Sequence, residues 1–139
     1  MSRATPNGRV VLVVDDEMHL RLFIKAVFES AGFTVGTASD GEQGLAWVRE
    51  NRPDLVSLDL MMPGQGGIRL LQQIRQDPEL ADIRVMVVSA IDDTTFHHAM
   101  ATVQAGVDER ISPVDGYVEK PPTAELILKE AERILGNRA

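Results

Sequence analysis

The stretch RVVLVVDDE, residues 9–17, joins an apolar run to three consecutive carboxylates. The run Val10–Val14 is β-branched and shows no polar alternation, which predicts a strand buried on both faces of a parallel sheet. Asp15, Asp16 and Glu17 would then gather where this strand ends. Two like charges about 4 Å apart repel by roughly 4 kcal/mol at an effective dielectric constant near 20. The stretch therefore predicts that a cation lies at this edge of the sheet.

The rest of the chain alternates short β-branched runs with segments of helical period. Further strands are predicted at residues 34–37, 55–58, 85–88 and around 117–118, and helices at about 20–31, 41–52, 67–77, 92–105 and 124–135. This alternation implies right-handed crossovers and a parallel sheet covered on both faces. We expect an α/β, flavodoxin-like doubly wound (βα)5 fold with the five strands in the order 2-1-3-4-5.

Composition limits what the protein can be. The 139 residues suit one domain, which we place at residues 9–136 after a flexible tail of residues 1–8. The absence of cysteine excludes disulfides, thiol catalysis and cysteine-ligated metals. A net charge of −7 argues against direct binding to nucleic acid. No apolar run suits a signal peptide or a membrane span, so we expect a cytoplasmic protein without membrane insertion.

Polar side chains follow the strands at the carboxyl edge, where ligands bind in such sheets. Asp15 and Asp16 follow the first strand, Asp59 the third, Ser89 ends the fourth, and Lys120 follows the fifth. One lysine cannot neutralise three carboxylates. Mg²⁺ commonly takes one or two carboxylates and keeps water or phosphate oxygens at its other positions, so we predict a magnesium site here.

The central carboxylate, Asp59, would have this metal and Lys120 beside it. Both cations would stabilise charge on phosphoryl oxygens, and the Ser89 hydroxyl would donate a hydrogen bond to one of them. The arrangement favours attack by Asp59 on a phosphorus centre.

Four segments carry a resemblance to a known family. They are VVDDE (residues 13–17), LVSLDLMMPGQGG (55–67), VMVVSA (85–90) and YVEKP (117–121). With them the chain resembles a response regulator receiver domain of two-component signal transduction, similar to the stand-alone CheY-like members, from about residue 9 to residue 135.

The resemblance implies that Asp59 accepts a phosphoryl group from a histidine of a sensor histidine kinase or a His-phosphotransfer protein. It implies that Asp16 and Asp59 bind Mg²⁺ directly, Asp15 mainly through water, and Met61 through its backbone carbonyl. Lys120 would pair with the phosphoryl oxygens, and the Lys-Pro bond that follows it is often cis in the family.

The resemblance also implies a switch. Ser89 would move toward phosphorylated Asp59 and Tyr117 would turn into the vacated space, which would change the face formed by the fourth helix, the fifth strand and the fifth helix. A downstream protein would bind that face. Such a protein is a stoichiometric phosphoacceptor, phosphorylated also by small donors and slowly self-dephosphorylating, rather than a metabolic enzyme.

Other functions fit less well. A haloacid-dehalogenase-type hydrolase would carry a D-x-D motif after the first strand, which DDE followed by Met18 does not match. A flavodoxin-like carrier would not place acids where a flavin phosphate binds. We expect a single-domain regulator, and the alternative is the receiver part of a larger regulator or hybrid kinase.

One segment departs from the family. The 31 positions from Ser89 to Lys120 exceed the usual spacing, and the extra length lies at residues 108–115. This extended loop either remodels the face formed by the fourth helix, the fifth strand and the fifth helix, or is a tolerated surface loop. A tolerated loop is plausible on energetic grounds because each doubling of loop length costs only about 0.6 kcal/mol.

Overall fold

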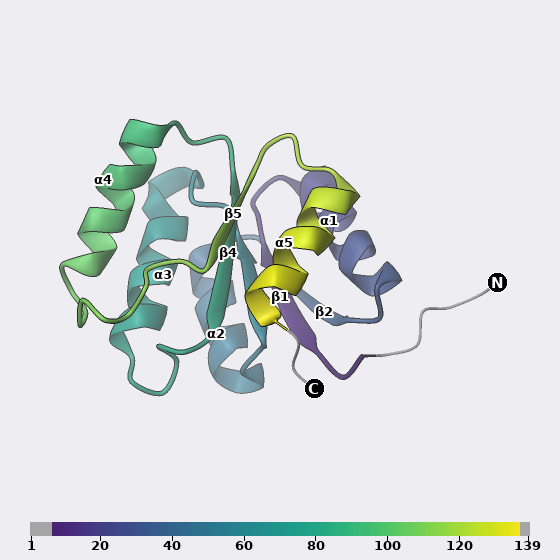
Figure 1. Cartoon of the computed structure of the whole chain (residues 1–139), viewed down its shortest axis with the longest axis horizontal. Coiled ribbons are helices and arrows are strands. Elements are labelled where there is room, and N and C mark those ends of the chain that lie inside the picture. The colour runs from purple at the N-terminus through teal and green to yellow at the C-terminus, as the bar shows by residue number, and fades with distance from the viewer. Residues whose placement is uncertain (1–6, 137–139) are drawn as a thin grey trace.

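The computed structural model describes residues 7–136 as one five-stranded parallel sheet between two layers of helices (Figure 1). The strand order β2-β1-β3-β4-β5 confirms the predicted topology. The strands are β1 (Val10–Val14), β2 (Thr34–Ala38), β3 (Leu55–Leu58), β4 (Arg84–Ser89) and β5 (Gly116–Glu119). The helices are α1 (Met18–Ser30), α2 (Gly41–Asn51), α3 (Gly66–Gln76), α4 (Asp93–Gln104) and α5 (Ala124–Leu135).

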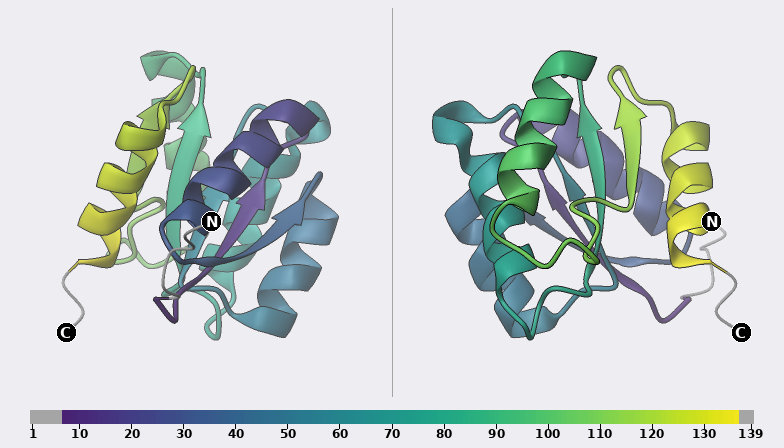
Figure 2. Two further views of the ribbon diagram at one scale, coloured as in Figure 1. Left: turned by 90° about the vertical axis from the view of Figure 1, so that its right-hand side faces the viewer. Right: turned by 60° about the vertical axis from the view of Figure 1, so that its left-hand side comes forward.

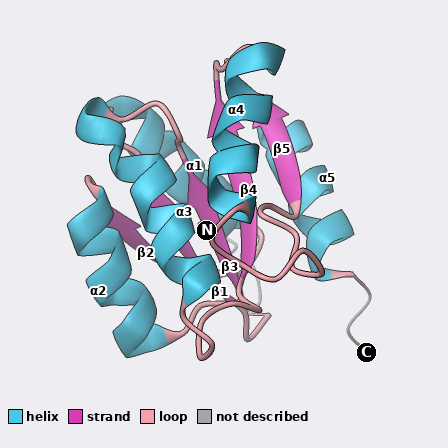
Figure 3. Ribbon diagram, turned by 90° about the vertical axis from the view of Figure 1, so that its left-hand side faces the viewer, coloured by secondary structure: helices cyan, strands magenta, loops and turns pink. Residues whose placement is uncertain are grey.

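Two apolar cores lie on the two faces of the sheet, with α1 and α5 on one side and α2, α3 and α4 on the other (Figures 2 and 3). Successive residues of β1 point to opposite cores. Val11 and Val13 pack with α1 and α5, whereas Leu12 and Val14 pack against α2 and α3. This explains why the opening stretch is apolar without alternation.

Side chains that cap the helices set where the helices begin. The carboxylates of Asp40 and Asp92 and the hydroxyl of Thr123 each accept a hydrogen bond from a first-turn amide, as N-caps do. Glu17 does the same for α1, which therefore begins at Met18, earlier than the apolar period alone predicted. The short 3-10 helix Pro63–Gln65 before α3 was not predicted.

The amino-terminal segment is described only from Asn7 onward, so most of the predicted tail, residues 1–8, lies outside the described residues. Asn7 itself donates hydrogen bonds to the carbonyls of Gly32 and Ala31. Among the described residues, no helix is long and apolar enough to cross a bilayer.

Candidate active site

The predicted site residues meet at the carboxyl edge of the sheet. Asp15, Asp16 and Asp59 each offer a carboxylate oxygen, and these three oxygens lie within 4.8 Å of one another. Asp15 and Asp59 lie close together because β1 pairs with β3. Val14 and Leu58, the last residues of these strands, lie side by side, and an aspartate follows each of them.

Asp59 is the centre of the polar contacts. It is buried, and its Oδ1 accepts hydrogen bonds from the Met61 amide at 2.9 Å and from Ser89 Oγ at 3.2 Å. Its Oδ2 accepts from Lys120 Nζ at 3.1 Å. The carboxylate of Asp59 is thus oriented by three donors from three different segments, while the Met61 side chain stays exposed.

Lys120 is the cation that reaches two of the acids. Its Nζ lies 3.1 Å from Asp59 and 3.4 Å from Asp15. Burial alone would lower the pKa of Lys120, but the hydrogen bond and charge of Asp59, with those of Asp15, raise the pKa above its usual value. The lysine is therefore held in its charged form. The peptide bond between Lys120 and Pro121 is cis.

Asp15 is buried, and this burial raises the pKa of its carboxyl. Its Oδ1 accepts from the Glu17 amide at 2.9 Å, and its backbone carbonyl accepts from Arg21 Nη1 at 2.8 Å. Arg21 was not predicted to contact the site. One feature of the sequence could have indicated this contact: Arg21 lies near the start of α1, where the helix dipole disfavours a positive charge unless a partner is present.

The donor set fits a magnesium ion. Three hard carboxylate groups converge, one lysine offsets only part of their charge, and Asp16 is exposed toward solvent. Within the described part of the chain, Asp16 makes no ion pair, so it is free to act as a ligand.

Close backbone packing fixes the segment after Asp59. A Cβ at Gly67 would overlap the Asp59 carbonyl and Leu60, so only glycine lets α3 approach the end of β3 this closely. Gly64 has φ of 68°, in the left-handed region that favours glycine. The sequence GQGG is thus the turn that brings α3 under the site.

Tyr117 lies beside the end of β4. Its ring is partly buried and packs edge-on against Phe96 of α4, with ring centroids 5.3 Å apart. Its hydroxyl donates to the carbonyls of Ser89 at 3.0 Å and Ile91 at 3.2 Å. Burial, with the charges of Glu119 and Asp93, raises the pKa of Tyr117. The two residues of the predicted switch are therefore in contact.

Comparison with known proteins agrees with this geometry. The sequence profile described as "Response regulator receiver domain" matches residues 11–132. The chain belongs to the response regulator receiver domain family. It is a module of two-component systems, and the acidic pocket of Asp15, Asp16 and Asp59 is the phosphorylation pocket of this receiver domain.

Similar proteins are full-length regulators as well as isolated receivers. The chain is 36% identical over 128 residues to the DNA-binding response regulator MtrA of Mycolicibacterium smegmatis, covering 91% of this chain and 51% of MtrA. It is 27% identical to the phosphate regulon transcriptional regulatory protein PhoB of Pseudomonas aeruginosa, covering 92% of the chain and 52% of PhoB. The chain thus spans about half the length of these curated relatives.

Solved structures agree on the fold. The receiver domain of the Francisella response regulator 1452 superposes with a TM-score of 0.71 at 29% identity, covering 92% of this chain and 97% of that one. The chemotaxis response regulator CheY4 of Vibrio cholerae gives a TM-score of 0.77 at 24% identity, covering 91% of this chain and 98% of CheY4.

Proposed function

We propose that this receiver is a phosphorylation-activated signalling switch in which Asp59 accepts a phosphoryl group from a histidine of a sensor histidine kinase or a His-phosphotransfer protein. The observation that carries the proposal is the set of contacts around the buried Asp59, with Lys120 Nζ at 3.1 Å and Ser89 Oγ at 3.2 Å. Both donors lie where the oxygens of an incoming phosphoryl group need hydrogen bonds.

In the transfer, a carboxylate oxygen of Asp59 attacks phosphorus, and the bond from phosphorus to the partner's histidine nitrogen breaks. Lys120 moves its contact from the carboxylate to a phosphoryl oxygen, and Ser89 donates to another. Asp16 and Asp59 would hold Mg²⁺ directly, Asp15 through water, and Met61 through its carbonyl. When bound, this ion supplies charge neutralisation for the phosphoryl oxygens.

The output follows from the contact between Ser89 and Tyr117. Because Tyr117 bonds the carbonyls of Ser89 and Ile91, a movement of Ser89 toward a phosphorylated Asp59 shifts the tyrosine and Phe96 with it. This changes the surface of α4, β5 and α5, where a downstream protein would bind. Phosphorylation then shifts a population between two arrangements, and the protein works as a stoichiometric phosphoacceptor.

We propose that the receiver, at residues 9–136, works in the cytoplasm, either alone or as the receiver part of a longer regulator. MtrA is named as DNA-binding, and this receiver covers only about half of it. The net charge of −7 favours a protein partner over direct contact with nucleic acid.

The test is intact-protein mass after incubation with Mg²⁺ and acetyl phosphate. Wild type should gain one phosphoryl group, and Asp59→Asn should gain none. Asp82→Asn serves as a matched control, because Asp82 is exposed and precedes β4 at the opposite edge of the sheet. A chelator should abolish the gain. Modification of Asp59→Asn at the wild-type rate would refute Asp59 as the acceptor.

A further inference from the structure

The strand that carries Lys120 is short and follows the extended loop. β5 has four residues, begins with Gly116 and lies at the edge of the sheet, paired only with β4. Only Val118 of its four residues is buried, so β5 offers few packed side chains to specify its register. A slip by one residue would move Lys120 by about 3.3 Å and turn Tyr117 to the other face of the sheet. The register of β5 therefore decides whether both residues reach the site.

Asp115, the last residue of the extended loop, bonds both backbone groups of Val85. Its amide donates to the Val85 carbonyl at 2.8 Å, and its Oδ2 accepts from the Val85 amide at 2.8 Å. The side chain thus replaces the backbone acceptor that a longer strand would supply. These two bonds align the start of β5 with β4, where Met86 lies opposite Gly116.

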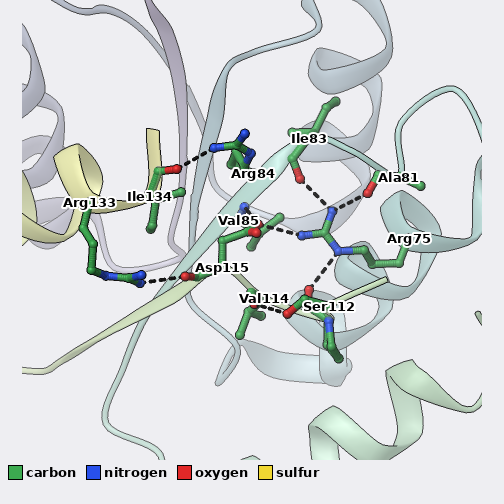
Figure 4. Close-up of polar contacts among 11 residues, drawn as sticks. Arg75, Ala81, Ile83, Arg84, Val85, Ser112, Val114, Asp115, Arg133 and Ile134 are labelled. Atoms are coloured by element: carbon green, nitrogen blue, oxygen red, sulfur yellow. Dashed lines mark hydrogen bonds and ion pairs between the residues drawn. The ribbon is translucent and has the colours of Figure 1, made fainter. Parts of the chain in front are cut away.

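Arg75 of α3 holds Asp115 from the interior (Figure 4). The side chain of Arg75 is 1% exposed, and its Nη2 lies 3.0 Å from Asp115 Oδ2. Its Nε donates to the Pro113 carbonyl at 2.9 Å. Its Nη1 donates to the carbonyls of Ala81 at 3.0 Å and Ile83 at 2.6 Å. One guanidinium therefore ties the end of the loop to the segment that leads into β4.

A second arginine binds the same residue from the other side of the sheet. Arg133 of α5 donates to the Asp115 carbonyl at 2.7 Å, and Glu130 accepts from the Tyr117 amide at 3.0 Å. The start of β5 is thereby fixed between α3 and α5. At its other end, the Lys120 amide donates to the Ser89 carbonyl at 3.1 Å.

We infer that Arg75 and Asp115 are positioning residues: they lock the register of β5 and so place Lys120 and Tyr117 at the phosphorylation pocket. The chemical part rests on the proposed function of Lys120, whereas the register part does not. A buried ion pair is weak evidence for stability, and fixing register is the best-attested use of one. The longer loop increases the need for such a lock, because it restrains the start of β5 less.

The main variant is Asp115→Ala, which removes the acceptor of the Val85 amide and the partner of Arg75. The matched control is Arg52→Ala. Like Arg75, Arg52 donates to a backbone carbonyl and pairs with a carboxylate. Both of these groups belong to Glu79, in the segment before β4. The contacts of Arg52 are exposed and do not involve β5.

Three measurements report the register of β5 and the phosphorylation of the site separately. Amide hydrogen exchange of Val85 and backbone NOEs between Val87 and Tyr117 report the register in the free protein. Tyr117 is the only tyrosine, so absorbance titration of tyrosinate reports the environment of this residue alone. The rate of phosphorylation by acetyl phosphate with Mg²⁺ reports the site.

For Asp115→Ala we expect faster Val85 exchange, weakened NOEs, a tyrosine that titrates nearer its ordinary value, and phosphorylation slowed at least about tenfold, since a 1 Å misplacement can cost 100-fold. Arg52→Ala should match wild type. Wild-type NOEs and rate in folded Asp115→Ala would overturn the inference.

If Asp115→Ala does not fold, Asp115→Asn decides, because asparagine keeps an acceptor for Val85 and loses the ion pair. An intermediate loss of register and rate supports the lock, and wild-type behaviour overturns it. If wild type itself takes no phosphoryl group, the proposed function fails, while the exchange and NOE data still test the register.

Discussion

Asp16→Asn should stabilise the metal-free protein although it removes a residue of the site. The carboxylates of Asp15 and Asp59 are both contacted by Lys120, whereas Asp16 makes no ion pair among the described residues. Asparagine has the same shape without the charge, so the substitution relieves repulsion and leaves the packing unchanged.

The size of the gain follows from the 4.8 Å limit on the separation of the three ligand oxygens. One like-charge pair at that distance costs about 0.9 kcal/mol in bulk water and about 3.5 kcal/mol at an effective dielectric constant of 20. Asp16 is exposed and Lys120 offsets part of the charge on its neighbours, so the lower figure applies. We expect about 1 kcal/mol, which raises Tm by about 3 °C in a protein of this length.

Urea unfolding with a chelator measures this gain, and Asp82→Asn should stay within about 0.5 kcal/mol of wild type. With Mg²⁺ at 100 times its Kd, wild type should gain about 2.7 kcal/mol and Asp16→Asn much less, so the order of stability reverses. A variant less stable than wild type in chelator would refute the repulsion argument. If Mg²⁺ stabilised wild type and Asp16→Asn equally, Asp16 would not be a ligand of the ion.

Two further substitutions and one deletion test other contacts. Ser89→Ala should slow phosphorylation by acetyl phosphate about fivefold, the equivalent of one neutral hydrogen bond, as measured by intact mass. The hydrogen bond from Arg133 lowers the pKa of Glu130, so its stabilising effect is present above the unfolded pKa of 4.5 and lost as pH falls below it. Glu130→Gln should therefore cost about 0.5 kcal/mol in urea unfolding at pH 7, and the difference should vanish in acid. Deleting residues 109–115 leaves Asp108 directly before Gly116, so phosphorylation should persist. The same deletion with Asp108→Ala should slow phosphorylation at least about tenfold, as Asp115→Ala does.

The sequence was sufficient for the strand order and for the meeting of the acids, because both follow from local patterns. An uninterrupted apolar run such as Val10–Val14 implies a central parallel strand, and the carboxyl ends of parallel strands share one edge. This rule predicted that Asp59 and Lys120 lie close together, although they are far apart in the chain.

The contacts of two arginines could not be predicted in this way. Arg75 and Asp115 are separated by 40 positions, and nothing in either segment encodes their distance. An arginine on a helix is ordinarily exposed, and Arg75 is buried because the loop and the segment before β4 both present acceptors to it. The bond of Arg21 to the Asp15 carbonyl likewise depends on the turn after β1.

The extended loop precedes β5 and therefore lies at the amino edge of the sheet, whereas the acids lie at the carboxyl edge. Natural variation can thus replace the exposed residues 108–110 without altering the residues of the phosphorylation pocket. Selection would keep an aspartate directly before Gly116 and leave the loop ahead of it open to change. Descendants of one receiver could in this way acquire different loops while inheriting the same chemistry.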